Sequence, residues 1–143
     1  MSCIFCQILD GSIPYQGIIR KWDYWTLMVS REQHTLGTMI LVHHAHTERF
    51  SSISSEALQE LQEVQRWAED RLDELFSPDL YNYLQCGNAV RHLHLHMIPR
   101  YRSDRSFMSH TFTDPAFGDS VQETTEIVSE DVLEGLRGGV LKN

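Results

Sequence analysis

The sequence predicts an α+β fold in which an antiparallel sheet packs against one long helix. Several short apolar, β-branched segments come first, a long helical stretch follows, and two more strand candidates come after it. A length of 143 residues is that of one domain. We expect residues 1–110 to form this domain, and residues 111–143 to be an acidic extension that packs on it or dangles from it.

Three strand candidates precede the helix, over residues 17–21, 25–29 and 37–42. The last one, Gly-Thr-Met-Ile-Leu-Val, is apolar and β-branched, which is typical of a buried strand. The run His-His-Ala-His follows it directly. The sheet therefore acquires a group of imidazoles at the end of a buried strand.

The helix is predicted from residue 55 to residue 76. Serines at 51–55 offer N-cap oxygens, and the sequence Ser-Pro-Asp at 77–79 ends the helical pattern. Its apolar residues recur at spacings of three and four, so they form one stripe that can pack on the sheet. The stripe consists of Leu58, Leu61, Val64, Ala68, Leu72 and Leu75.

The strands after the helix are predicted at residues 80–86 and 90–101, joined by a turn or bulge at Gly87 and Asn88. The chain then becomes irregular and acidic, and a short helix is predicted at residues 130–137. Segments as irregular as residues 102–129 carry no periodic signal, so we predict no element there.

Composition limits the classes of protein that the chain can be. It is 41% hydrophobic and 22% charged, as in an ordinary globular protein. No segment approaches the ~20 consecutive apolar residues of a membrane span, and the first residues lack the pattern of a secretory signal. We therefore expect a cytoplasmic protein that does not bind membranes. The net charge of −8 argues against general nucleic-acid binding but permits a small anionic ligand in a local site.

Cys3 and Cys6 form a Cys-x-x-Cys motif, which is either half of a metal site or a redox pair. A redox pair normally opens a helix after a strand, and only two residues precede Cys3, so we favour the metal site. A tetrahedral Cys₂His₂ zinc site needs two imidazoles, and spacing alone does not decide which ones. Six of the eight histidines lie in two clusters, His43, His44 and His46, and His92, His94 and His96. The third cysteine, Cys86, is expected to be a small buried residue.

The second histidine cluster alternates with apolar residues over His92-Leu-His-Leu-His96. On a β-strand this alternation places the imidazoles on one face, roughly 6–7 Å apart. Three functions fit such a face. The rings could bind a catalytic zinc ion, one ring could act as a nucleophile on phosphorus, or the rings could bind an anion. A nucleophile also needs donors for the phosphate oxygens, and Asn82, Asn88 and the backbone N–H groups near Gly87 are close in sequence.

The chain resembles the histidine triad (HIT) superfamily of nucleotide hydrolases and transferases. The resemblance covers roughly residues 3 to 101 and rests on several motifs in the right order. They are the triad His-Leu-His-Leu-His-Met-Ile at 92–98, the segments at 3–8 and 11–14, the strand at 37–46, Gly87-Asn88, and Pro-Arg-Tyr at 99–101. The resemblance implies an antiparallel half-barrel sheet with a long helix, assembled as a homodimer.

The resemblance also implies the site residues. His94 would be the nucleophile that attacks the α-phosphorus of a nucleotide, and His96 would contact the phosphate and assist proton transfer. Asn82 and Asn88 would hold phosphate oxygens. A structural zinc ion would be bound by the residues Cys3, Cys6, His46 and His92. The substrate would be a dinucleoside polyphosphate or a nucleoside phosphoramidate.

Four positions depart from the family pattern. Asn88 stands where many members have glutamine, Ala89 replaces a hydroxyl residue, Ser30 an acidic residue, and Thr38 a histidine. The last three departures motivate an alternative, in which the domain is a regulatory module that binds nucleotides without turnover and retains the structural zinc. A catalytic-zinc hydrolase is a further alternative.

Overall fold

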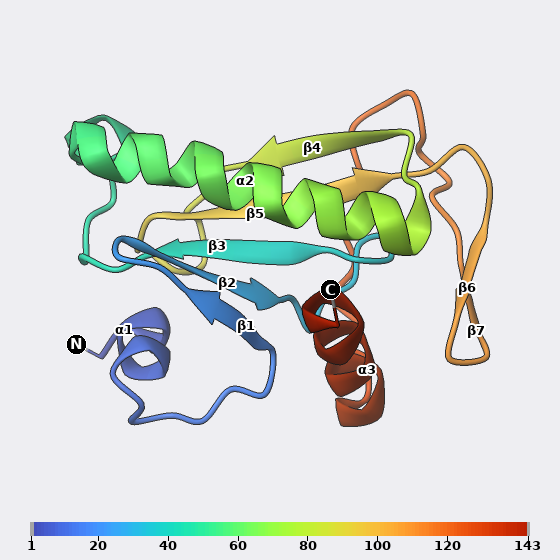
Figure 1. The fold of residues 1–143 in the computed structure, drawn as a ribbon, viewed down its shortest axis with the longest axis horizontal. Helices are drawn as coiled ribbons and strands as arrows, with labels where there is room; N and C mark the ends of the chain where they lie inside the picture. Colours follow the sequence, from blue (N-terminus) through green and yellow to red (C-terminus); the bar gives the residue numbers. More distant parts are fainter. Residues whose placement is uncertain (1, 143) are drawn as a thin grey trace.

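The computed structural model describes residues 2–142 and contains a five-stranded antiparallel sheet (Figure 1). Its strands, in the spatial order β1-β2-β3-β5-β4, are β1 (Ile18–Lys21), β2 (Trp25–Val29), β3 (Met39–His43), β5 (His94–Arg100) and β4 (Leu80–Leu84). The α-helices of this part of the chain are α1 (Ile4–Leu9), α2 (Ser55–Phe76) and α3 (Glu130–Leu141). A 3-10 helix at Phe50–Ser52 and a hairpin of β6 (Arg105–Phe107) and β7 (His110–Phe112) complete the described elements. The predicted fold class is confirmed.

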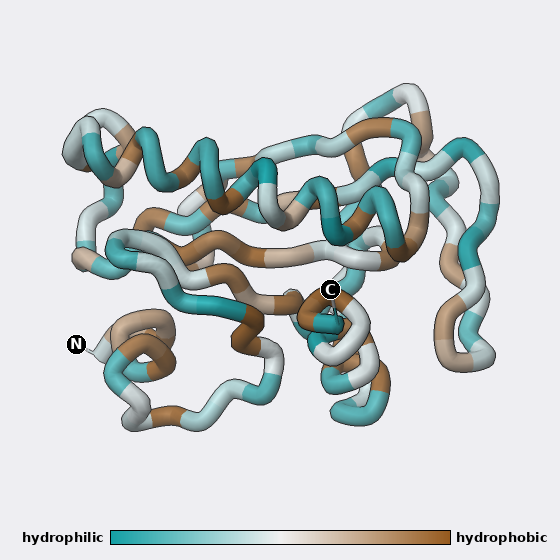
Figure 2. The backbone as a smooth tube through the Cα atoms, viewed as in Figure 1, coloured by the Kyte–Doolittle hydropathy of each residue, from teal (hydrophilic) through white to brown (hydrophobic). Residues whose placement is uncertain are grey.

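Helix α2 lies across one face of the sheet (Figure 1). It begins after Ser54, whose hydroxyl accepts the N–H of Ala57 at 3.1 Å, and it ends at Ser77, where φ is 48°. Polar and apolar residues alternate along it in Figure 2, in agreement with an amphipathic helix. Its buried residues are Ala57, Leu61, Val64, Ala68, Leu72 and Phe76. The prediction for Leu58 was wrong, because this side chain is 51% exposed and Ala57 faces the sheet instead.

The two faces of the sheet carry different residues because strand side chains alternate. On β5, Leu95 and Met97 join the main core beneath α2. His94, His96, Ile98 and Arg100 therefore lie on the opposite face. There Val42 and Met28 form a second small core with Phe5 and Ile8 of α1. The triad thus lies on the face of the sheet that α1 partly covers.

Gly37 permits close packing between this sheet and α2. Its φ is +90°, a left-handed conformation that side chains with a Cβ rarely adopt. A Cβ at this position would lie 3.0 Å from Leu72 Cδ2 and 3.3 Å from Pro99 Cγ. The turn before β3 therefore requires glycine.

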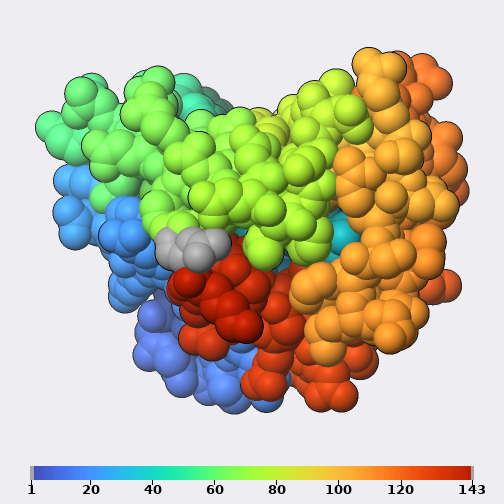
Figure 3. All heavy atoms as spheres, turned by 45° about the vertical axis from the view of Figure 1, so that its right-hand side comes forward, coloured from blue at the N-terminus to red at the C-terminus, as the bar shows by residue number. Residues whose placement is uncertain are grey.

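The last helix, α3, packs on the sheet and on α2. Helix α3 lies against α2, β1 and β2, and its buried apolar residues belong to the main core. Figure 3 shows α3 below α2, with the β6–β7 region beside both. α3 was predicted at residues 130–137 and continues to Leu141, while α1 and the hairpin were not predicted. No helix within residues 2–142 is long and apolar enough to cross a membrane.

Candidate active site and metal centre

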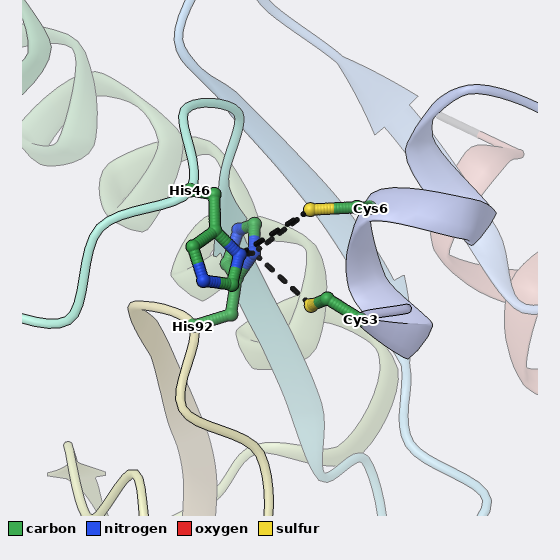
Figure 4. Close-up of side chains that lie close together, drawn as sticks. All are labelled: Cys3, Cys6, His46 and His92. Atoms are coloured by element: carbon green, nitrogen blue, oxygen red, sulfur yellow. Dashed lines mark hydrogen bonds between the residues drawn. The ribbon is translucent and has the colours of Figure 1, made fainter. Parts of the chain in front are cut away.

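Four side chains from three distant parts of the chain converge at one corner of the sheet (Figure 4). Cys3 and Cys6 flank the first turn of α1, His46 follows β3, and His92 precedes β5. Their ligand atoms all lie within 4.8 Å of one another. These are the four residues that the resemblance implied as metal ligands.

The spacing at this corner fits a tetrahedral zinc site. The Nδ1 atom of His92 lies 3.4 Å from Cys3 Sγ, 3.6 Å from Cys6 Sγ and 3.2 Å from His46 Nδ1, and Cys6 Sγ lies 3.4 Å from His46 Nδ1. Bonds of about 2.3 Å to sulfur and about 2.0 Å to nitrogen give tetrahedral edges of roughly 3.3–3.8 Å. Two thiolates with two imidazoles are also the donors that zinc prefers.

The second ring nitrogen of His92 supports the same assignment. Its Nε2–H donates to the backbone carbonyl of His43 at 2.6 Å, so Nδ1 carries the lone pair that points to the cysteines. Burial lowers the pKa of His92, which favours the neutral imidazole that a metal needs.

His94 has the opposite arrangement. Its Nδ1–H donates to the carbonyl of His92 at 2.6 Å, so Nε2 is the nitrogen with the free lone pair. The side chain is 6% exposed, and its ring packs at 4.7 Å, between centroids, from the ring of Phe5. An imidazole held in one tautomer and one orientation is suited to act as a nucleophile.

His96 lies beside His94, with ring centroids 5.2 Å apart. Burial lowers the pKa of His96 to about 4, and the neighbouring rings of His94 and His34 contribute in the same direction. The ring is therefore neutral near pH 7. Its Nδ1 is buried and has no hydrogen-bond partner among residues 2–142, so a ligand that reaches this atom would satisfy it.

A cavity of about 540 Å³ opens over these two rings. Its volume is in the range of small-ligand sites. The walls come from α1, the loop before β3, the loop between β4 and β5, and the chain after β7. The lining residues are Phe5, Tyr15, Ser30, Arg31, Glu32, His34, Ile40, Cys86, Gly87, Asn88, Ala89, Val90, His94, His96, Glu123, Thr124, Thr125 and Ile127.

The two asparagines that were predicted to bind phosphate lie in two different places. Asn88 lines the cavity with His94 and His96, in the loop between β4 and β5. Asn82 lies on β4 and lines a neighbouring depression, while its Oδ1 accepts a hydrogen bond from Arg100 Nη1 at 2.7 Å.

Two residues of the cavity differ from what the sequence suggested. His34 was not predicted, yet its ring lies 6.0 Å from that of His96, and its Nδ1 accepts the N–H of Thr124 at 2.9 Å. His34 is a lone histidine far from the triad in sequence, so no spacing signal marks it. The prediction that Cys86 is buried was wrong, because it lies in the exposed loop between β4 and β5.

Comparison with known proteins agrees with this geometry. An uncharacterised HIT-like protein of Methanocaldococcus jannaschii is 28% identical over 95% of this chain and 99% of its own. A hypothetical histidine triad nucleotide-binding protein from Sulfolobus tokodaii has a similar structure, with a TM-score of 0.76 and 18% identity over 98% of this chain and 90% of its own. A zinc-bound histidine triad protein from Mycobacterium smegmatis superposes with a TM-score of 0.67 and 22% identity, over 98% of this chain and 94% of its own. The HIT domain model matches residues 15–103, and the chain therefore belongs to the HIT, or histidine triad, family.

Proposed function

We propose that the protein is a nucleotide hydrolase that acts through a covalent nucleotidyl-histidine. The observation that carries the proposal is the 2.6 Å hydrogen bond from His94 Nδ1 to the carbonyl of His92. It fixes the tautomer in which Nε2 has the free lone pair, in a side chain that lines the cavity. The volume of the cavity is that of a small-ligand site, which agrees with nucleotide binding by this family.

In the first step His94 Nε2 attacks the α-phosphorus and the bond from phosphorus to the leaving group breaks. Water then attacks the same phosphorus, the bond to Nε2 breaks, and the nucleoside monophosphate leaves. His96 contacts the phosphate and assists proton transfer. Asn88 and the backbone N–H groups near Gly87 hold phosphate oxygens, and Asn82 does so from the edge of the site.

A structural zinc ion is part of the proposal. Cys3, Cys6, His46 and His92 would hold it, and the zinc-bound relative from Mycobacterium smegmatis supports this choice. The ion would supply no chemistry to the reaction and would fix the N-terminal segment beside the sheet. We further propose that the protein is a homodimer and that it acts in the cytoplasm, where its free thiols stay reduced.

The test is intact-mass spectrometry of the protein during brief incubation with adenosine 5′-phosphoramidate or diadenosine tetraphosphate. Wild-type protein is expected to gain an AMP adduct transiently and to release AMP. In His94→Ala both should vanish, with turnover reduced by at least about 10⁴-fold, because the nucleophile is gone. The variant should still fold, because the ring lines the cavity and its hydrogen bond within residues 2–142 goes to a backbone carbonyl, so no buried side chain loses its partner.

The alternative is a regulatory module that binds nucleotides without turnover, which Ser30, Thr38 and Ala89 motivate. It predicts that the wild type binds AMP, forms no adduct and releases no product. It also predicts that His94→Ala hardly changes nucleotide affinity. Such a result would replace the hydrolase by the binding module.

A further inference from the structure

The loop between β2 and β3 is held together by a buried glutamine. Gln33 is 7% exposed, and its Nε2 donates to the carbonyls of Ser30 at 2.7 Å and Thr38 at 2.8 Å. Its Oε1 accepts the N–H of Gly37 at 2.7 Å. Because these bonds satisfy the amide of Gln33 and join both ends of the loop, the next residue, His34, starts from a fixed backbone position.

The tautomer of His34 is fixed by a backbone group. Its side chain lines the cavity with His94 and His96, and its ring centroid lies 6.0 Å from that of His96. The N–H of Thr124 donates to His34 Nδ1 at 2.9 Å. A ring nitrogen that accepts a hydrogen bond carries no proton, so the proton of this ring is on Nε2. In one cavity, Nε2 is therefore a donor in His34 and a free lone pair in His94.

The Thr124 amide comes from a part of the chain outside the matched HIT domain, which covers residues 15–103. The chain around Thr124 is held against the β2–β3 loop, since the N–H of Val128 donates to the carbonyl of Arg31 at 2.9 Å. A segment beyond the family domain therefore determines which nitrogen of His34 can donate a hydrogen bond.

The cavity is poor in positive charge for a site that would bind a phosphate. Among the described residues, Arg31 is the one lysine or arginine that lines it. Its guanidinium lies 5.0 Å from the ring centroid of Tyr15 and pairs with Glu130 at 3.4 Å. Glu32 and Glu123 add two carboxylates to the lining. Phosphate oxygens in this cavity therefore depend on neutral N–H donors, as anionic oxygens do in oxyanion holes.

We propose that His34 is a further catalytic residue, whose Nε2–H donates to a non-bridging oxygen of the α-phosphate during attack. This inference rests on the proposed function. The hydrogen bond stabilises the negative charge that the equatorial oxygens carry in the transition state.

His34 keeps its own proton throughout the reaction, because giving it up would leave an imidazolate anion. The lone pair of His94 Nε2 forms the new bond to phosphorus. The bond from phosphorus to the leaving group breaks, and its electron pair stays with the leaving group, which takes a proton from water. His34 therefore acts as a fixed donor and not as a general acid.

Two substitutions separate the two nitrogens of His34. The amide of asparagine takes the place of Nδ1, so His34→Asn keeps an acceptor for Thr124 and loses the donor in the cavity. The amide of glutamine takes the place of Nε2, so His34→Gln keeps the donor and loses that acceptor. For adenosine 5′-phosphoramidate we expect kcat to fall about 100-fold in His34→Asn and less than about tenfold in His34→Gln. KM should change by less than about threefold in either variant, since the donor acts mainly on the transition state.

Hydrogen exchange at the amide of Thr124, measured by NMR, distinguishes a structural role of His34 from the proposed one. Exchange should be faster in His34→Gln, which lacks the acceptor, and near the wild-type rate in His34→Asn. If kcat instead follows this exchange rate, with His34→Gln the slower enzyme, His34 only anchors the C-terminal segment and the proposal is overturned. Equal kcat values in the two variants would overturn it as well.

His110→Asn is the matched control. It makes the same substitution at an exposed histidine on β7 that does not line the cavity, so its kcat should equal that of the wild type. A wild type that forms no AMP adduct and releases no AMP would overturn the proposed function, and this inference with it. An active wild type with equal His34 variants would overturn only the role of His34.

Discussion

His92 and His94 are two residues apart, yet the backbone fixes them in opposite ways. In His92, Nε2–H donates to a backbone carbonyl, and Nδ1 faces the cluster of Cys3, Cys6, His46 and His92, which we call the metal corner. In His94, Nδ1–H donates to a backbone carbonyl, and Nε2 is left for the cavity. The difference teaches that residue type does not determine the role of an imidazole at this site. The role depends on which ring nitrogen the backbone engages.

The largest effect is expected at the metal corner. Cys6→Ser should lower the melting temperature by roughly 10 °C, because the proposed zinc ion, which would stabilise only the folded chain, would bind less tightly. Thermal unfolding of zinc-loaded protein measures this. Cys86→Ser is the control, since Cys86 is exposed and lies outside the four-residue cluster.

A chelator titration sharpens the same comparison. With a structural zinc ion, activity and thermal stability decline together as the metal is removed. Loss of activity at a chelator concentration that leaves the melting temperature unchanged would assign the metal to catalysis. His92 and His94 would then both serve the reaction.

A smaller effect is expected at the cavity on acidification. The pKa of His96 is about 4 in the folded protein, and that of histidine in an unfolded chain is near 6.5. Between these values the unfolded chain binds more protons, so the contribution of His96 to stability is present above about pH 6.5 and is lost toward pH 4.

Urea unfolding at several pH values tests this contribution. In His96→Gln the decline toward acid pH should be shallower than in the wild type, by on the order of 2 kcal/mol in the free energy of unfolding. Parallel pH profiles for the two proteins would show that His96 is not buried in its neutral form.

The smallest effect is expected at a residue that belongs to neither centre. Ser54→Ala removes the hydroxyl that caps α2, which should cost about 1 kcal/mol, or roughly 3 °C in melting temperature. Zinc content and kcat should stay at wild-type values. A change in either would show that the start of α2 is coupled to one of the centres, and Ser55→Ala is a suitable comparison because its side chain is not the N-cap.

The sequence predicted the elements whose pattern is long and periodic. The long helix and the sheet strands follow from apolar spacing, so their positions came within a few residues of the observed ones. Helix α1 has only six residues, too few for a periodic signal, and its position depends on packing of Phe5 and Ile8. The β6–β7 turn has positive φ at Met108 and Ser109. Hairpin turns of this kind usually contain glycine or asparagine, so the sequence did not predict this one.

The candidate site was predictable only in part for a related reason. Motifs identify the triad and the Cys-x-x-Cys pair because those residues are close in sequence. The contact between His34 and Thr124 joins residues 90 positions apart, and the ion pair of Arg100 with Asp114 fixes a segment that has no pattern of its own. Such contacts exist only once the chain has folded.

Phe5 lies between the two cysteines in sequence, and its ring touches both His92 and His94. The Phe5 ring therefore packs against a residue of the metal corner and also lines the cavity. This shared residue limits how the protein can evolve. A related protein without the two cysteines would need another way to hold α1 against the sheet. Otherwise the cavity would lose the side chain of Phe5 as a wall.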